Sequence, residues 1–255
     1  MAERRVDELA RLTTKPHEPP LSFVLEAPEE GVESGYARWA STYDAGGNWL
    51  IDLEEPVVHA WIDRLPAGRA LDAACGTGRH TAHLHARGHD VIGTDGSEAM
   101  LACARTNLPG IDLRRADLAA LPIESASMDL VLCALALTHV ERLEPVVREL
   151  ARVLRAGGRM ILSDFHPLLV ALGGTGFFVG DDGRAGYVTT YYHPHSEYLA
   201  SFRSAGLAIE DCAEPLCGER EVKLMAQGLD RFAPEACAQA FGRLPGALVW
   251  QLVRG

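Results

Sequence analysis

The stretch Leu71-Asp-Ala-Ala-Cys-Gly-Thr-Gly-Arg79 decides how this chain folds. The apolar residues that lead into it predict the end of a β-strand, and residues 80–87 behind it have helical character. Gly76 and Gly78 permit a tight loop whose backbone a ligand can approach closely. A strand, a glycine-rich loop and a helix N-terminus together predict a nucleotide-binding corner.

Two features of this loop separate the nucleotide classes. The dinucleotide fingerprint calls for a third glycine or alanine at the position where this chain has Thr81. Asp72 precedes the glycines, and its carboxylate would repel a pyrophosphate but accept hydrogen bonds from a ligand ammonium. The loop therefore argues against a nicotinamide dinucleotide and suits a ligand that presents an ammonium group.

A second motif, Asp90-Val-Ile-Gly-Thr-Asp95-Gly-Ser-Glu-Ala-Met100, follows one strand-helix-strand repeat later. Its apolar pair predicts a short buried strand that ends at Asp95. An acid at this point suits bidentate capture of a ribose diol, although it could also merely end the strand. Ser97 has the type and position of a helix N-cap.

Two further motifs complete a pattern. Arg115-Ala-Asp117-Leu-Ala-Ala-Leu-Pro122 follows the predicted third strand, and Arg155-Ala-Gly157-Gly158-Arg-Met-Ile-Leu162 leads from a predicted helix into the fifth strand. In this order and at this spacing, the motifs resemble those of the class I S-adenosylmethionine (SAM) methyltransferases, in particular the small-molecule methyltransferase type 11 group. The resemblance covers about residues 36–164, and the predicted C-terminal strand fits it as well.

The resemblance implies an α/β fold with a Rossmann-like, doubly wound, seven-stranded sheet, mostly parallel, and a reversed C-terminal strand. We expect a flexible N-terminal arm over residues 1–30 and an N-terminal helical lid over 31–68. The SAM-binding methyltransferase domain would span 69–255. An insert after strand five, about residues 165–195, would cap the substrate.

The implied cofactor is S-adenosyl-L-methionine, with S-adenosyl-L-homocysteine (SAH) as product. Asp72 would lie at its methionyl end, Asp95 at the ribose and Asp117 at the adenine amine. Tyr36 and Tyr43, two helical turns apart, are predicted to share a helical face over the cofactor, or else to pack on the core. The full set of predicted cofactor contacts is Tyr36, Tyr43, Asp72, Ala74, Gly76, Gly78, Asp95, Gly96, Ser97, Met100, Ala116, Asp117, Leu118 and Cys133.

The insert predicts the shape of the substrate. A hairpin is expected from about residue 176 to 192, with its turn at Asp181-Asp-Gly183, followed by a helix that Ser196 caps. In this fold ligands bind at the carboxyl ends of the strands, so the insert would cover the substrate pocket. Its aromatic residues indicate a flat, apolar or aromatic substrate, and the predicted contacts are Phe177, Phe178, Tyr191 and Tyr192.

Three histidines are candidates for a general base, the role histidine most often takes near neutral pH. His139 follows strand four, His166 ends strand five and His193 follows the hairpin. Each could instead have a structural role. Residues 80–85 hold three more histidines on a helix that we expect to face solvent without an acidic partner, so no metal site is predicted.

Composition limits the partners. The net charge of −11 disfavours nucleic acid, and the segment Cys133-Ala-Leu-Ala-Leu-Thr-His139 lacks the Asn/Asp-Pro-Pro-aromatic tetrad of enzymes that methylate base amines. No apolar run is long enough to span a membrane. Six cysteines without a close pair indicate reduced, buried thiols and a cytoplasmic protein, monomer or homodimer.

The predicted activity is that of a SAM-dependent methyltransferase, EC 2.1.1.-, acting on an O, N or C nucleophile of a small, aromatic molecule. The alanine- and arginine-rich composition suggests bacterial specialised metabolism, hence natural product biosynthesis. Three alternatives stay open. The same fold could catalyse a reaction without methyl transfer, such as a cyclisation; the chain could be a nicotinamide-dependent oxidoreductase; or it could be a non-catalytic SAM-binding regulatory protein.

Overall fold

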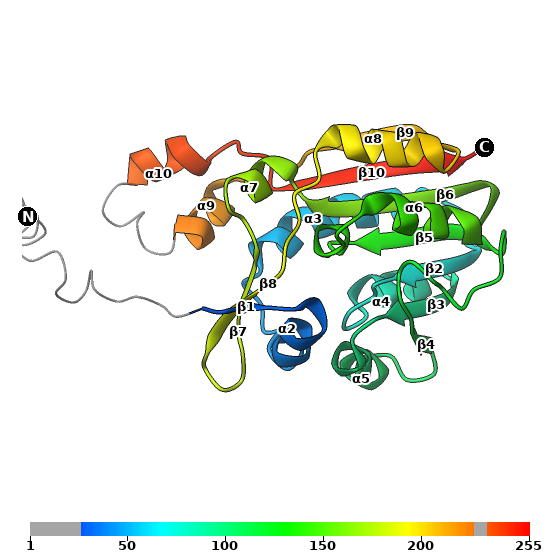
Figure 1. The fold of residues 1–255 in the computed structure, drawn as a ribbon, viewed down its shortest axis with the longest axis horizontal. Coiled ribbons are helices and arrows are strands. Elements are labelled where there is room, and N and C mark those ends of the chain that lie inside the picture. The colour runs from blue at the N-terminus through cyan, green and yellow to red at the C-terminus, as the bar shows by residue number, and fades with distance from the viewer. Residues whose placement is uncertain (1–26, 227–233) are drawn as a thin grey trace, which may run out of the picture.

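A seven-stranded sheet forms the centre of the computed structural model, which describes residues 27–226 and 234–255. Its strand order is β4-β3-β2-β5-β6-β10-β9 (Figure 1). Only β10 is antiparallel to its neighbours, so the predicted mostly parallel sheet with a reversed C-terminal strand is confirmed. The strands are β2 (Arg69–Ala73), β3 (Asp90–Asp95), β4 (Asp112–Arg115), β5 (Met128–Ala134), β6 (Leu154–Phe165), β9 (Leu207–Ala213) and β10 (Ala247–Arg254).

Helices cover both faces of this sheet (Figure 1). Side chains of α3 (Trp49–Ile62) and α4 (Arg79–Ala86) join one apolar cluster with Leu130 and Leu132 of β5. Side chains of α6 (Leu143–Val153) and α8 (His195–Ser204) join the other cluster with Val131 and Cys133. Because β5 is buried on both faces, its sequence from Leu130 to Ala134 is continuously apolar rather than alternating.

The helix α5 (Glu98–Asn107) packs against β3 and β4, and Ser97 is its N-cap as predicted: the Ser97 hydroxyl accepts from Met100 N. The predicted cap of α8 is wrong. That helix begins at His195, one residue before Ser196, and its N-cap is Pro194 without a side-chain hydrogen bond. Proline has no N–H to leave unsatisfied there and presets a suitable φ.

The lid region holds two helices, α2 (Val32–Trp39) and α3, around the predicted glycine-rich break. The expectation that Tyr36 and Tyr43 share a helical face is wrong, because α2 ends at Trp39. The chain then turns, and the two tyrosine rings still lie 6.3 Å apart between centroids. Loop geometry rather than helical spacing therefore brings these rings together.

The insert forms a small sheet of its own beside the carboxyl ends of the main strands (Figure 1). The hairpin consists of β7 (Gly176–Val179) and β8 (Ala185–Val188), so it ends earlier than residue 192. Strand β1 (Glu29–Glu30) pairs with β8 in parallel, which makes the end of the predicted arm part of this sheet. Residues 1–26 of the arm lie outside the described residues.

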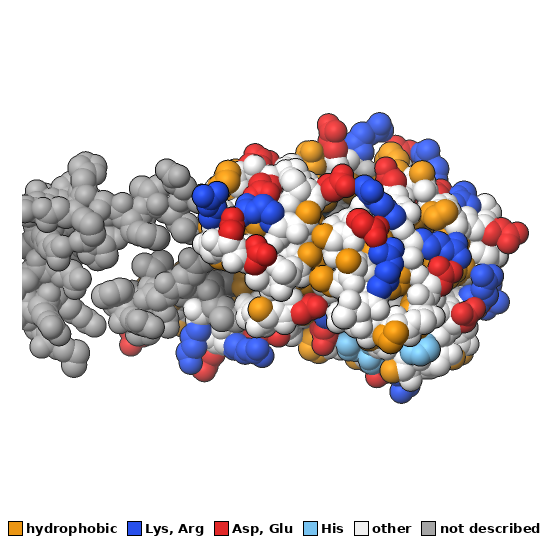
Figure 2. Space-filling view, turned by 90° about the horizontal axis from the view of Figure 1, so that it is seen from below, with side chains coloured by type: hydrophobic (Ala, Val, Ile, Leu, Met, Phe, Trp, Pro, Cys, Tyr) orange, Lys and Arg blue, Asp and Glu red, His pale blue; other side chains and the backbone are white. Residues whose placement is uncertain are grey.

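Short elements complete the chain: η1 (Leu137–His139) after β5, α7 (Pro167–Ala171) after β6, and α9 (Glu219–Ala226) and α10 (Pro234–Phe241) before β10. On the face shown in Figure 2, acidic and basic side chains are interspersed over the described part of the molecule. None of the described helices combines the length and the apolar character needed to cross a membrane. Cys212 is exposed, contrary to the expectation that the thiols are buried.

Candidate functional site

Two cavities meet at the carboxyl ends of the central strands. One, of about 700 Å³, lies over the glycine-rich loop and is called here the loop-side cavity. The other, of about 810 Å³, lies between the lid and the insert and is called the aromatic cavity. Four residues line both: Tyr36, Tyr43, Leu135 and His139. Anything bound in one cavity is therefore in reach of a molecule bound in the other.

Left-handed backbone conformations shape the loop. Gly76 has φ 55° and Gly78 has φ 94°, and Ala74 also has a positive φ, 60°. A side chain at Gly78 would place its Cβ 2.6 Å from Leu108 Cδ1, so the α4 N-terminus requires glycine for space as well as for conformation. A strained alanine at such a position is typical of ligand-binding turns.

Asp95 ties this loop to the end of β3. Its two carboxylate oxygens accept hydrogen bonds from Gly76 N and Ser97 N, each at 2.8 Å. Burial raises the pKa of Asp95, and the backbone donors partly offset that rise. A carboxylate has about four acceptor positions, so Asp95 can still accept from the two hydroxyls of a ribose.

Asp72 does not line either cavity and lies beneath the loop. It is 1% exposed, and its carboxylate accepts a hydrogen bond of 2.6 Å from the Thr81 hydroxyl. Burial raises the pKa of Asp72. Asp72 therefore ties the end of β2 to α4 in this structure, and the direct ligand contact expected of it is not seen in the cavity lining.

Most of the predicted cofactor residues do line the loop-side cavity: Tyr36, Tyr43, Ala74, Gly76, Asp95, Gly96, Ser97, Met100, Ala116, Asp117 and Leu118. Gly78 and Cys133 do not. Cys133 is fully buried on the α6 and α8 side of the sheet, and the loop at the end of the strand, from Ala134, reaches the cavity instead. Successive side chains of a strand point to opposite faces, and this alternation could have distinguished Cys133 from Ala134 in the sequence.

Sequence reasoning missed two charged residues at the mouth of this cavity. Arg115 donates to Gly96 O at 3.1 Å and forms an ion pair of 2.7 Å with Glu33 of α2. Both side chains line the cavity and both are exposed. The pair joins the lid to the end of β4. No local pattern predicts a contact between residues so far apart in the chain.

His139 and Tyr36 form a hydrogen-bonded pair where the cavities meet. His139 Nδ1 lies 2.8 Å from Thr189 O, and Nε2 lies 2.9 Å from Tyr36 Oη. Since a carbonyl oxygen only accepts, Nδ1 carries the proton and Tyr36 donates to Nε2. Burial lowers the pKa of His139 and raises that of Tyr36 well above its ordinary value. The imidazole is therefore neutral at neutral pH and can take up a proton.

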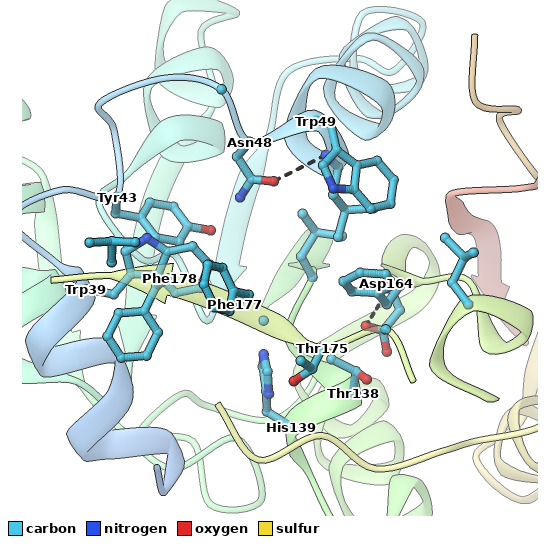
Figure 3. A pocket seen from close by; sticks show the side chains of 18 of the residues that line it. Trp39, Tyr43, Asn48, Trp49, Thr138, His139, Asp164, Thr175, Phe177 and Phe178 are labelled. Atoms are coloured by element: carbon cyan, nitrogen blue, oxygen red, sulfur yellow. Dashed lines mark hydrogen bonds between the residues drawn. The ribbon is translucent and has the colours of Figure 1, made fainter. Parts of the chain in front are cut away.

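Aromatic rings form the walls of the aromatic cavity (Figure 3). Trp39 of the lid stacks on Phe178 of the hairpin with centroids 5.5 Å apart and an interplanar angle of 18°. Phe177 also lines the cavity, as predicted for both phenylalanines. Tyr191 and Tyr192 do not, because β8 ends before them and the chain turns away toward α8.

His166 and His193 lie outside both cavity linings. His166 caps α7 by accepting from Leu168 N at 3.1 Å, and its other ring nitrogen is 3.1 Å from Glu214 Oε1. His193 is buried, with one ring nitrogen 2.8 Å from Val140 O. The structure thus brings one of the three candidate bases, His139, to the cavities.

One described group has the spacing of a metal site: His166, His195 and Glu214. The hydrogen bond by which His166 caps α7 decides whether this group can bind a metal. Because His166 Nδ1 accepts from Leu168 N, the proton of the neutral ring lies on Nε2, which then donates to Glu214 rather than offering a lone pair to a metal. The cluster is better explained as a hydrogen-bonded tie between β6 and the chain that follows β9.

The expectation of a solvated histidine face on α4 is wrong for His80. This residue is 4% exposed, and its Nε2 lies 3.2 Å from Glu54 Oε1. Glu54 is fully buried and also accepts from Arg79 at 3.1 Å and from the Ser163 hydroxyl at 2.6 Å. This buried network joins α3 to the first turn of α4 and to β6. His83 also has an acidic partner, Asp63.

Comparisons with known proteins agree with this arrangement. A family model described as a methyltransferase domain matches residues 71–162, which include the glycine-rich loop and Asp95.

Residues 71–162 belong to a class I SAM-dependent methyltransferase domain.

Its cofactor is accordingly S-adenosylmethionine. The solved structure of a SAM-dependent methyltransferase from Mesorhizobium loti is 27% identical, with a TM-score of 0.59, and the match covers 83% of this chain and 99% of that one.

Curated relatives match about half of this chain. The biotin biosynthesis bifunctional protein BioHC of Cellvibrio japonicus is 35% identical over 141 residues, 53% of this chain and 27% of that protein. The malonyl-acyl-carrier-protein O-methyltransferase of Enterobacter lignolyticus is 35% identical over 133 residues, 51% of each chain. The chain thus spans about half of the length of the second relative and about a quarter of the first.

Proposed function

We propose that this chain transfers the methyl group of SAM to an O, N or C nucleophile of a small molecule. The observation that carries the proposal is the meeting of the two cavities at Tyr36, Tyr43, Leu135 and His139. A methyl donor in the loop-side cavity and an acceptor in the aromatic cavity would face each other there. Most of the catalysis can then come from positioning the two molecules.

The loop-side cavity suits SAM in its donor set. Asp95 would accept from the ribose hydroxyls, since its carboxylate keeps acceptor positions beyond the two backbone bonds. Asp117, with Met100 and Leu118, would frame the adenine. Ala74 and Gly76 would lie at the methionyl end, where no side chain beyond a methyl group fills the space. Among the described residues, Arg115 is the one cation that lines this cavity, so they form no cluster of cations for a phosphate, which supports the choice of SAM over a dinucleotide.

The pair of Tyr36 and His139 provides a route for a proton. When bound, SAM supplies a methyl group on a sulfonium, which is already a strong electrophile. Tyr36 Oη would accept the proton that the acceptor loses and pass its own proton to His139 Nε2. Nδ1–H would remain bonded to Thr189 O and hold the ring in place. His139 was one of three candidates from sequence, and its position supports it over the other two.

The surroundings of the site support a small-molecule acceptor. The aromatic cavity lies between the lid and the insert, with a volume that suits a drug-sized ligand. The net charge of −11 and the interspersed surface charges of Figure 2 do not favour a polyanion such as nucleic acid.

Calorimetry tests the proposal first. We expect the full chain to bind SAM and SAH in the micromolar range and not to bind a nicotinamide dinucleotide. Mass spectrometry of acceptor screens should then find products heavier by one methyl group. Tight binding of the dinucleotide instead would indicate an oxidoreductase. Bound SAM without any methylated product would favour the same-fold alternatives, a cyclisation or a regulatory protein.

A further inference from the structure

The charged groups of the aromatic cavity are unbalanced. Asp164, at the carboxyl end of β6, is the one carboxylate among the described residues that line it, and no lysine or arginine lines it. His139 is neutral there, because burial lowers its pKa. A positively charged group of a ligand would therefore meet one carboxyl group and, among the described residues, no lysine or arginine in this cavity.

Neutral groups hold the Asp164 carboxylate. The Tyr198 hydroxyl donates to Oδ2 at 2.7 Å, and Phe165 N donates to Oδ1 at 2.8 Å. Asp164 is 2% exposed, and among the described residues no lysine or arginine forms an ion pair with it. Burial raises its pKa to about 7, although these hydrogen bonds and the electrostatic influence of His193 lower it. A buried carboxylate without a lysine or arginine partner is costly, and a ligand cation beside it would relieve that cost.

The walls around this carboxylate suit a cation as well. Figure 3 shows Asp164 on the same side as Thr138, with Trp49 above it and Trp39, Phe177 and Phe178 across the cavity. The negative faces of aromatic rings attract ammonium groups and stack on flat apolar bodies. A ligand with an aromatic body and one positive end matches both the rings and the acid.

We propose that the substrate of this chain is a small aromatic amine whose ammonium group binds Asp164. The inference rests on the proposed function and names the substrate class of the same site. It leaves open which atom of the amine receives the methyl group. It predicts exclusion of carboxylate-bearing molecules, since the cavity would place two negative charges together without a cation.

Three probes of one shape test this inference: tryptamine, its alcohol counterpart tryptophol, and indole-3-acetate. Each is titrated by calorimetry into the full chain saturated with SAH. We expect tryptamine to bind on the order of tenfold more tightly than tryptophol, and indole-3-acetate not to bind. In Asp164→Asn, tryptamine and tryptophol should bind alike. The matched control Asp211→Asn, on the exposed strand β9, should keep the preference for tryptamine.

Binding of SAH separates folding from recognition. An Asp164→Asn protein that binds SAH like the wild type but has lost the preference for the amine supports the inference, because a purely structural role would not alter that preference alone. A preference for the amine that persists in Asp164→Asn would overturn it, as would equal binding of the three probes or binding of none of them. Selective binding of tryptamine by a chain that does not bind SAH would contradict the proposed function instead.

Discussion

At the scale of single residues, the site depends on a few side chains that each perform two tasks. Asp95 holds the backbone of the loop and presents a carboxylate to the loop-side cavity. His139 fixes its own tautomer on Thr189 O and leaves Nε2 toward Tyr36. These hydrogen bonds hold both side chains in place, because a polar group that loses its partner away from water is left with an uncompensated free energy of desolvation.

We expect Asp95→Asn to weaken SAH binding by about 1.5–3 kcal/mol, the usual value of hydrogen bonds to a charged group. The asparagine keeps the shape of the side chain but loses the charge and half of the acceptor capacity. Calorimetry measures the change, with Asp211→Asn as the matched control. Unchanged affinity in a folded Asp95→Asn protein would remove the ribose assignment.

His139→Gln should lower the rate of methyl transfer on the order of 10²-fold, because it removes the group that takes up the proton. The affinity for SAH should change little. Tyr36→Phe should lower the rate in the same way if the proton passes through Oη, and His166→Gln, outside both cavities, should leave it unchanged.

The pH dependence of the same reaction gives an independent test. Since burial lowers the pKa of His139 below its ordinary value of 6.5, the neutral base persists to lower pH than a free histidine would. The rate should fall only below that value as the pH decreases, and His139→Gln should lose this acidic limb. An acidic limb that remains in the variant would assign the proton transfer to another group.

At the scale of elements, the lid is held by packing rather than by its own helix propensity. The helix α2 rests on β8, and Gly35 is its one buried residue. A Cβ at Gly35 would lie 2.9 Å from Val188 Cγ2, whereas a Cβ at Gly31 would lie 3.8 Å from Ser34 Oγ, an ordinary van der Waals distance. The position of Tyr36 over both cavities therefore depends on a small residue beside it.

Gly35→Ala should shift α2 away from β8 and raise the dissociation constant of SAH about tenfold, since overpacking typically costs about 1–3 kcal/mol. Gly31→Ala, four residues earlier with a φ of −59° that alanine accepts, should bind SAH like the wild type. Calorimetry measures the affinity of both variants for SAH. Equal affinities would mean that the lid does not contribute to this cavity.

At the scale of the whole molecule, one buried acid joins three elements. Burial alone would raise the pKa of Glu54, but His80, Arg79 and Ser163 outweigh it and lower the pKa from 4.5 to about 2. A lowered pKa of an acid contributes stability above the unfolded value, and this stability is lost as the pH falls from 4.5 toward 2. The difference corresponds to about 3 kcal/mol.

Urea denaturation at pH 7, 5 and 2 measures this contribution. The wild type should lose about 3 kcal/mol more of its free energy of unfolding between pH 5 and 2 than Glu54→Gln does. The exposed control Glu141→Gln should lose as much as the wild type. The contribution of Asp164 to the free energy of unfolding has the opposite dependence on pH, because its raised pKa reduces stability as the pH rises from 3.8 to about 7. That effect is common to all three proteins and cancels in the comparison, and identical acid slopes in all three would contradict the assignment to Glu54.

The amino-acid sequence alone indicated where the central strands lie along the chain, the glycine-rich loop and the acid at the end of β3. These features follow from local rules: apolar runs predict buried strands, and glycines permit turns with positive φ. The loop-side cavity could therefore be predicted largely from one stretch of chain and its strand-helix-strand neighbour.

Only the tertiary structure decided which side chains face a ligand. Cys133 points into the core although it was predicted to contact the cofactor, and His166 caps a helix although it was a candidate base. Contacts such as Tyr36 with His139, or Arg115 with Glu33, join segments whose separation no local pattern reports. The direction of a side chain at a strand end depends on the packing of distant helices, and so the choice among the three histidines required the fold.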